Sequence, residues 1–416
     1  MHRCLILIGL LACLSCTKVP VPSSLVSTSP VRVYSSSKGL SLTSMEPAQD
    51  GGYIFCGHTP AGAGLGDLAF LMKTKANGDI EWQKTFGGAQ VNGFLKARQT
   101  KDGGYISVGY SSSYGFGPKS GVYYADAWMV KTDAQGNQVW QNTFGNVYGD
   151  TFYDVKEMPD QGFVMATRFD DTDAYWGKPP ANFIVQAGVV RTDNMGKGMW
   201  VHEFYKTQYR TNAQSIDLSP SGDIVVGCMI VKSNASSDQA SFFPGLLYIN
   251  TTGRITHLAS VFSTLGLCKD IHIVAATDGV YMAFDGKGSG INNINLFKVG
   301  YNGKIIWQKQ FASNVWLSDF RSAGNGNYYL SASNYLGKSS MVFTSDASGN
   351  LISSVNCQNS TTGTNDQNAV TIATVNGFPT PTGWAFAVSV PPTYQDNANK
   401  FVLTFTDKNG KINDHE

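Results

Sequence analysis

The side chains best suited to acid–base or ligand chemistry are charged residues that recur in short segments with the alternation typical of β-strands. They are Lys96, Arg98, Asp154, Lys156, Asp217, Asp270, His272, Asp319 and Arg321. We predict that these segments are the inner strands of a repeated unit and that their charges surround a central channel. Carboxylates beside cations and an imidazole could transfer protons or hold a ligand, and they could also be solvated or paired with one another. Residue types alone leave these alternatives open.

The densest acidic cluster, residues 170–173, is the candidate for a bound cation. Asp171 and Asp173 stand at alternate positions, as in a calcium loop, but the glycine needed for its sharp turn comes late, at Gly177. A solvated loop is the alternative. The six histidines lack HxH and HExxH spacing, and the sequence has no GxSxG, SxxK or phosphate-loop motif. We therefore expect no cofactor, and no metal beyond this calcium candidate.

Internal repeats indicate which elements position these residues. The motif DGGYI occurs at residues 50–54 and again at 102–106, and KTKANGDIEWQKTFG at 73–87 matches KTDAQGNQVWQNTFG at 131–145. Each repeat reads as two hairpins, that is, four strands. The turn glycine of the second hairpin recurs seven times, at Gly78, Gly136, Gly196, Gly253, Gly303, Gly349 and Gly410. Seven repeats of four strands predict an all-β fold, a seven-bladed β-propeller with antiparallel blades.

Aromatic residues mark the fourth strand of most repeats. Trp82, Trp140, Trp200 and Trp307 each follow the turn glycine by four positions, and a phenylalanine follows each tryptophan by four more. Residues four apart share one face of a strand, so we expect both rings to pack against a neighbouring blade. Too few residues follow Gly410 for such a strand, whereas residues 31–37 have no hairpin partner. We predict that this N-terminal strand closes the last blade, so that residues 31–416 form one propeller domain.

The repeat DGGYIxxG followed by LMKTxAxGxxxWQxTFG resembles the delta-60-like propeller repeats of secreted and lipid-anchored Bacteroidetes proteins. Residues 131–140 also resemble the tryptophan-docking motif of pyrroloquinoline-quinone dehydrogenases and outer-membrane assembly propellers, although the Thr-Gly pair of that motif is absent here. The resemblance covers nearly the whole chain after residue 30 and is strongest in the first two repeats. In those families the motif is structural, so it implies the fold and leaves the function to be argued from a site.

Extra length falls mainly between the second and third strands of a repeat, at residues 110–126, 168–183, 230–244 and 390–399. In a propeller these connections emerge on one face, which we call the insertion face; it also carries the connections between blades. Aromatic residues exposed in such loops are typical of glycan or protein recognition, although they could also pack onto their own loops. The candidate ligand-binding residues are Tyr114, Tyr123, Tyr124, Tyr175, Trp176, Phe242, Phe243 and Tyr394.

The first thirty residues have the pattern of a targeting segment. A short basic start precedes an apolar run at residues 4–14, too short to span a bilayer, and then Ser15-Cys16. This pattern resembles a bacterial lipobox, which makes residues 1–15 a signal peptide, Cys16 the lipidation site and residues 16–30 a Pro/Ser tether. Cys13 is the competing site. We expect an outer-membrane lipoprotein, periplasmic or surface-exposed, and a monomer.

Composition limits the partners. The chain has 416 residues, 45 glycines, 12% aromatic residues and a net charge of +1, which argues against a nucleic-acid partner. Cys56, Cys228, Cys268 and Cys357 lack CxxC spacing and could be buried thiols or include a disulfide.

We predict a module that binds a glycan, peptide or envelope protein through the insertion face. The alternatives are a propeller enzyme with its site in the channel, either a hydrolase/lyase or a quinoprotein-like oxidoreductase, and a structural scaffold.

Overall fold

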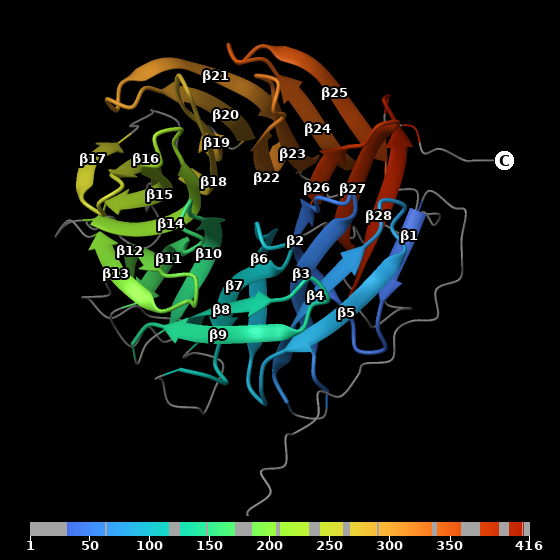
Figure 1. Cartoon of the computed structure of the whole chain (residues 1–416). Coiled ribbons are helices and arrows are strands. Elements are labelled where there is room, and N and C mark those ends of the chain that lie inside the picture. Colours follow the sequence, from blue (N-terminus) through green and yellow to red (C-terminus); the bar gives the residue numbers. More distant parts are fainter. Residues whose placement is uncertain are drawn as a thin grey trace, which may run out of the picture.

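The computed structural model describes residues 31–62, 65–115, 125–146, 149–170, 185–204, 209–232, 242–260, 267–288, 291–334, 339–358, 375–390, 399–409 and 411. These residues form 28 strands with connecting turns, grouped into seven four-stranded antiparallel sheets. No helix occurs among them, and so none that could cross a membrane. The seven sheets are arranged as blades around a central axis (Figure 1). The all-β, seven-bladed propeller is therefore confirmed.

Each blade runs from an inner strand at the channel to an outer strand at the rim. We number the blades 1 to 7 in the chain order of their inner strands, so that each list below runs from blade 1 to blade 7. The inner strands are β2 (Ser41–Pro47), β6 (Asn92–Gln99), β10 (Asp150–Glu157), β14 (Tyr209–Leu218), β18 (Leu267–Ala276), β22 (Val315–Ser322) and β26 (Val375–Pro379). The second strands are β3 (Tyr53–Pro60), β7 (Tyr105–Ser111), β11 (Phe163–Asp170), β15 (Ile224–Lys232), β19 (Gly279–Gly288), β23 (Tyr328–Asn334) and β27 (Gly383–Val390).

The third strands are β4 (Asp67–Thr74), β8 (Asp126–Thr132), β12 (Val185–Thr192), β16 (Phe242–Ile249), β20 (Ile291–Val299), β24 (Ser339–Ser345) and β28 (Lys400–Asp407). The outer strands are β5 (Ile80–Phe86), β9 (Gln138–Phe144), β13 (Gly198–Phe204), β17 (Ile255–Ser260), β21 (Ile305–Ser313), β25 (Leu351–Gln358) and β1 (Val31–Ser35).

The N-terminal strand closes the ring, as predicted. β1 pairs with β28 from Val31 opposite Thr404 to Ser35 opposite Lys400, so the seventh sheet has the order β1-β28-β27-β26. Figure 1 shows the two ends of the described chain side by side in this blade. Tyr34 anchors the strand, because its buried ring packs on Phe401 and its hydroxyl donates to the carbonyl of Gly78 in blade 1 at 2.5 Å. Closure covers an edge of β28 that would otherwise be open to pairing with other chains.

The tryptophans of the outer strands close the seams between blades. The indole of Trp82 in blade 1 donates to the carbonyl of Ala134 in blade 2 at 3.1 Å and stands edge-on to Tyr105. It also covers Gly136, where an added Cβ would lie 2.6 Å from the ring. Gly136 has φ +75°, so this turn needs glycine for its backbone and for the space the indole takes. Trp140, Trp200 and Trp307 cover the turn glycines of the next blades in the same way.

The hydrophobic core is divided among the seams instead of lying in one central mass. One cluster joins Ile54 and Leu71 of blade 1 to Phe94 and Trp128 of blade 2, and the other seams have clusters of the same kind. Each blade is therefore stabilised by apolar burial against its neighbours, at roughly 25 cal/mol for each Å² removed from water. This packing holds the inner strands in place around the channel.

Candidate functional site

The inner strands present two tiers of side chains to the channel. Each inner strand of blades 1 to 6 has an irregular register one or a few residues before the first tier, consistent with β-bulges that re-aim the strand. Residues of different blades are matched through their partners on the second strands. The first tier consists of Ser44, Lys96, Asp154, Ser215, His272 and Asp319. The second tier lies two residues later and consists of Glu46, Arg98, Lys156, Asp217, Val274 and Arg321.

Ion pairs between these side chains join neighbouring inner strands. Lys96 of blade 2 lies 2.9 Å from Glu46 of blade 1, and Arg98 lies 2.9 Å from Asp154 of blade 3. Lys156 of blade 3 continues the chain to Asp217 of blade 4, also at 2.9 Å. Between blades 5 and 6, His272 Nδ1 lies 3.9 Å from a carboxylate oxygen of Asp319.

The last link passes in front of blade 7. Arg321 of blade 6 donates from two guanidinium nitrogens to the carboxylate of Glu46 in blade 1, with Nη2 and Oε1 2.9 Å apart, and it also pairs with Asp319. Ion pairs thus join the inner strands of blades 6, 1, 2, 3 and 4, and the link from blade 6 to blade 1 omits the seventh. Blade 7 has Phe378 at the second-tier position, and the guanidinium of Arg321 lies 4.4 Å from the centre of its ring.

Three carboxylates of this network, Glu46, Asp154 and Asp319, are held as anions. Burial alone would raise the pKa of Glu46, but the charges of Arg321, Lys96 and Arg98 outweigh it and hold the pKa well below its usual range. The pKa values of Asp154 and Asp319 are lowered in the same way, with burial opposed chiefly by Arg98 and by Arg321 respectively. Burial lowers the pKa of His272, against the opposing effect of Asp319, so this imidazole is neutral near pH 7.

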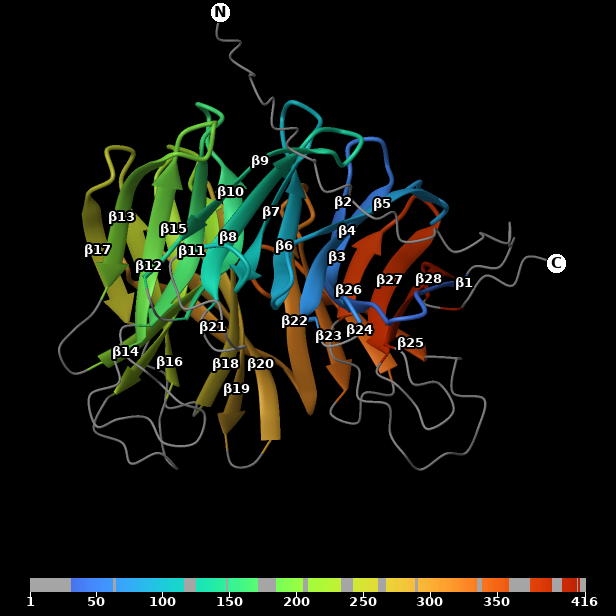
Figure 2. The same cartoon turned by 90° about the horizontal axis from the view of Figure 1, so that it is seen from below.

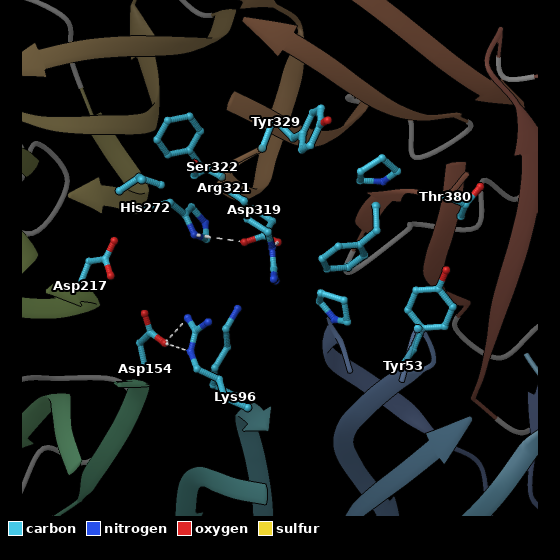
Figure 3. A pocket seen from close by; sticks show the side chains of 18 of the residues that line it. Tyr53, Lys96, Asp154, Asp217, His272, Asp319, Arg321, Ser322, Tyr329 and Thr380 are labelled. Atoms are coloured by element: carbon cyan, nitrogen blue, oxygen red, sulfur yellow. Dashed lines mark hydrogen bonds and ion pairs between the residues drawn. The ribbon is translucent and has the colours of Figure 1, made fainter. Parts of the chain in front are cut away.

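A cavity of about 930 Å³ occupies the channel and extends toward the junction of blades 7 and 1. Its inner wall carries the charged tiers, and its outer wall carries aromatic rings and prolines, among them Tyr53, Phe378 and Phe405. Figure 3 shows Lys96, Asp154, His272 and Asp319 facing the cavity on one side and Tyr53 and Thr380 on the other. Burial raises the pKa of Tyr53 to about 12, so its hydroxyl stays protonated.

The mouth of the cavity lies among the tight hairpin turns. Gly51, Ala76, Asn77 and Thr380 line it, and they belong to the turns between first and second or third and fourth strands. We call this side of the molecule the turn face; it is the upper side in Figure 2. The site that the structure describes therefore opens opposite the predicted insertion face.

Among the described residues, no indole closes the seam between blades 7 and 1. Tyr34 pairs with Phe401 in blade 7 as Phe86 pairs with Ala69 in blade 1, so the position that matches Trp82 falls at residue 30, before β1 begins. In place of an indole, the side chain of Arg32 and the hydroxyl of Tyr34 lie against Gly78. Arg32 also lies 3.7 Å from Asp79 and lines the outer end of the cavity.

Of the nine charged residues predicted from the sequence, all but Asp270 line the cavity. Glu46 was missed, although it stands four residues before the turn residue Asp50, as Arg98 stands four before Asp102. That spacing is the signal that could have found it. Aromatic residues Tyr53, Phe378 and Phe405 were missed as well, because the repeat pattern places blade 7 beside blade 1 but does not say which of their side chains meet in the channel.

Most of the predicted insertion-face residues lie outside the described residues: Tyr123, Tyr124, Tyr175, Trp176 and Tyr394, and also Asp171, Asp173 and the lipidation candidates Cys13 and Cys16. Tyr114 is described and packs its half-buried ring on Trp128, 5.8 Å between centres. Phe242 and Phe243 lie at the start of β16, opposite Val231 and Ile230 of β15. Ligand binding by these residues stays a prediction.

The described residues give little sign of metal or thiol chemistry. Within them no group of three His, Cys, Asp or Glu side chains is arranged to hold a metal ion. The thiols of Cys56, Cys228 and Cys268 are free and buried, and burial raises the pKa of Cys56 and Cys228 to about 12. A buried carboxyl outside the channel, Asp150, has its pKa raised to about 7, chiefly by burial and also by neighbouring carboxylates.

Comparison with known proteins is informative about the fold. No protein-family profile matches the sequence, and no curated protein sequence is significantly similar to it. A protein of unknown function from Dyadobacter fermentans is 11% identical over 73% of this chain and 95% of its own, with a TM-score of 0.46. Another from Bacteroides caccae is 11% identical over 70% and 91%, with a TM-score of 0.40.

An ulvan lyase, a polysaccharide lyase, superposes with a TM-score of 0.51 at 10% identity, over 69% of this chain and 75% of its own. At such low identity the likeness extends to the architecture and not to the chemistry of a site. The chain is similar in fold to the ulvan lyase, and the other two structures are Bacteroidetes proteins whose function is unknown.

Proposed function

We propose that this protein is a binding module of the cell envelope that captures a glycan, a peptide or an envelope protein. One observation supports this proposal above the others: a cavity of about 930 Å³ lies on a rigid ring of blades, and the charged side chains that line it are already engaged in ion pairs. A concave site with aromatic walls and a few fixed polar groups is typical of ligand binding.

The electrostatics of the channel favour binding over catalysis. A general acid at neutral pH needs a pKa near 7, but Glu46, Asp154 and Asp319 have pKa values below their usual range and cannot donate a proton there. Their charges are also fixed by partners on neighbouring strands. Such a network keeps the wall in one geometry, as recognition of a ligand requires.

The insertion face is part of the same proposal. Tyr123, Tyr124, Tyr175, Trp176 and Tyr394 would add a second contact surface for a large ligand, on the side opposite the cavity. We further propose that the leader is removed before Cys16 and that a lipid on Cys16 holds the propeller at the outer membrane through residues 16–30. The sequence pattern of the leader supports this localisation.

An enzyme acting at the channel is the second candidate, and His272 favours it. This imidazole lines the cavity in its neutral form beside the carboxylate of Asp319, so it could accept a proton from a substrate. A lyase would need such a base, and the fold is shared with a polysaccharide lyase. His272→Ala separates the two proposals, because it would abolish turnover by an enzyme, whereas a binding module would show no turnover with or without this imidazole.

A glycan and envelope-protein array tests the proposal with the full-length protein. We expect the wild type to retain a ligand without changing it chemically, and Trp176→Ala and Tyr124→Ala to weaken that binding if the insertion face contributes. Unchanged binding by both variants would limit the ligand to the cavity. Cleavage of the ligand that His272→Ala abolishes would favour the enzyme, and a wild type that binds nothing would overturn both candidates.

A further inference from the structure

In every salt bridge of the channel the cation is more exposed than its carboxylate. The side chain of Arg98 is 23% exposed and that of Asp154 is 8%, and Lys156 is 29% exposed while Asp217 is 16%. Backbone groups explain the difference: Asp154 accepts N–H donors from Val155 and Ile216, which draws the carboxylate back into the strands. The cavity therefore meets a ligand with positive charge.

Three of these cations share one carboxylate. Glu46 receives Lys96, Arg98 and Arg321, and its own side chain is 7% exposed, whereas Lys96 and Arg321 are 15% and 18% exposed. Five cationic side chains line the cavity against three carboxylates, with Glu46 set behind them. An anionic group placed there would complement the wall.

The open seam gives the cavity an extended shape. It continues from the charged wall to Arg32 and Asn77 at the rim of blades 7 and 1, whereas at the seam between blades 1 and 2 the indole of Trp82 covers the matching turn glycine, Gly136. Half-buried Phe405 and exposed Pro379 offer apolar faces there, and Thr380 and Asn77 offer a hydroxyl and an amide. Apolar faces interspersed with neutral hydrogen-bonding groups suit sugar rings, whose C–H faces and hydroxyls alternate.

We infer that the cavity binds an acidic polysaccharide, with a carboxylate of the chain at Lys96 and Arg321 and further sugar rings in the seam between blades 7 and 1. This inference rests on the proposed binding function and names the ligand class and its path. It assigns the turn face, and not the insertion face, as the side that the chain enters.

The first test compares ligands of equal length on the full-length protein. The probes are an oligogalacturonate, the neutral maltohexaose and a poly-glutamate peptide, with affinity measured by calorimetry. We expect the oligogalacturonate to bind about tenfold or more tightly than either comparator and to weaken between about 50 mM and about 300 mM NaCl. Equal binding of maltohexaose would overturn the charge assignment, and equal binding of poly-glutamate would overturn the saccharide assignment.

The second test fills the seam with the ring it lacks. Asn77→Trp places an indole at an exposed turn position that lines the cavity, and Gln135→Trp makes the same change at the matching turn of blade 2, where Trp82 already closes the seam. We expect Asn77→Trp to lower the affinity for oligogalacturonate about tenfold and Gln135→Trp to leave it unchanged. Equal affinities of the two variants would show that the seam is not the path.

A third pair of variants tests the exposed charge. Lys156→Gln removes the most exposed cation of the salt bridges, while Asp217 keeps the N–H donors of Leu218 and Ala275. Lys197→Gln removes an exposed cation from a turn of blade 3, outside the cavity. We expect about a fivefold loss of affinity for the first and none for the second.

The outcomes separate this inference from the proposed function. Retention of another ligand on the array, lost in the insertion-face variants and insensitive to Asn77→Trp, would overturn the inference and leave the binding module standing. A wild type that binds neither the array nor the probes would overturn both.

Discussion

The seam between blades 1 and 2 and the seam between blades 7 and 1 are built from the same repeat, yet one is closed and the other is open. In the first, Trp82 reaches across to the turn of the next blade and seals it. In the second, the outer strand comes from the opposite end of the chain and begins one residue after the tryptophan position. Closing the ring with an N-terminal strand thus leaves at this seam an opening that Trp82 fills between blades 1 and 2.

Removing the closing strand should have the largest effect. Deletion of residues 31–37 with everything before them exposes β28 and the site of Tyr34, so we expect the free energy of unfolding to fall by at least about 4 kcal/mol. Urea unfolding measures the change. Truncation of residues 1–30 alone is the control and should leave stability unchanged; equal stability of the two truncated chains would refute closure by β1.

Breaking the ion pairs of Glu46, which include the link to Arg321 across blade 7, should have the next largest effect on stability. Glu46→Gln leaves Arg321, Lys96 and Arg98 facing a neutral amide, and breaking a buried ion pair from one side costs about 3–5 kcal/mol. Urea unfolding of this variant beside Glu203→Gln, a change on the exposed face of β13, gives the comparison. A loss no greater than that of the control would mean that the ion pairs of Glu46 do not hold the inner strands of blades 6, 1 and 2 together.

The same pairs predict a direction for pH dependence. Glu46, Asp154 and Asp319 have folded-state pKa values below their unfolded values of 4.5 and 3.8, so their stabilisation is complete above those values and is lost as pH falls through the folded pKa. Stability should therefore drop from about pH 5 to about pH 3. Chemical unfolding at several pH values should give a shallower slope for Glu46→Gln; an identical slope would contradict the assignment.

Opening the seam between blades 1 and 2 should lower the free energy of unfolding by a smaller amount. Trp82→Ala removes a half-buried indole and its hydrogen bond to the carbonyl of Ala134, at about 2–3 kcal/mol. Hydrogen exchange in the turn at residues 133–137 should quicken, because its cover is gone. Val139→Ala, at an exposed position of β9, should change neither quantity, and a similar result for Trp82→Ala would show that the indole does not seal the seam.

Turn glycines give the finest comparison. Gly103 has φ +82° with nothing within 4 Å of an added Cβ, so alanine there should cost about 1 kcal/mol from backbone strain alone. Gly136→Ala should cost about 1–2 kcal/mol more because of Trp82. Gly78→Ala should fall between them, since the flexible side chain of Arg32 can move. Thermal unfolding ranks the three, and any other order would contradict the difference between the seams.

Repeats made the fold predictable from the sequence. The turn glycines needed a positive φ that few other residues adopt, and the paired Trp and Phe marked the outer strands, so blade number and the closing strand followed from counting. The candidate site was predictable in part. Alternation placed eight cavity-lining charges on inner strands, but the bulge that aims them is invisible in the sequence, and Glu46 was missed although its spacing from Asp50 marks it.

The open seam depends on contacts between the two ends of the chain, and that is why it was not predicted. Tyr53 and Phe405 are separated by most of the sequence, and their rings lie 6.3 Å apart only after the ring has closed. A register count gives the missing signal in retrospect: once Tyr34 is matched to Phe86, the tryptophan position must fall at residue 30. Composition and periodicity carry no such long-range register.

The direction of β1 affects which ligands could reach the cavity if the chain is anchored to a membrane. Val31 pairs with Thr404 and Ser35 with Lys400, so the first residue of β1 lies nearer than its last to the turn face, where the cavity opens. If Cys16 carries a lipid, the leash of residues 16–30 would extend at most about 50 Å. The cavity mouth and the point of attachment would then lie on the same side of the propeller. A polymer would have to lie close to the bilayer, or pass between the bilayer and the propeller, to enter the cavity.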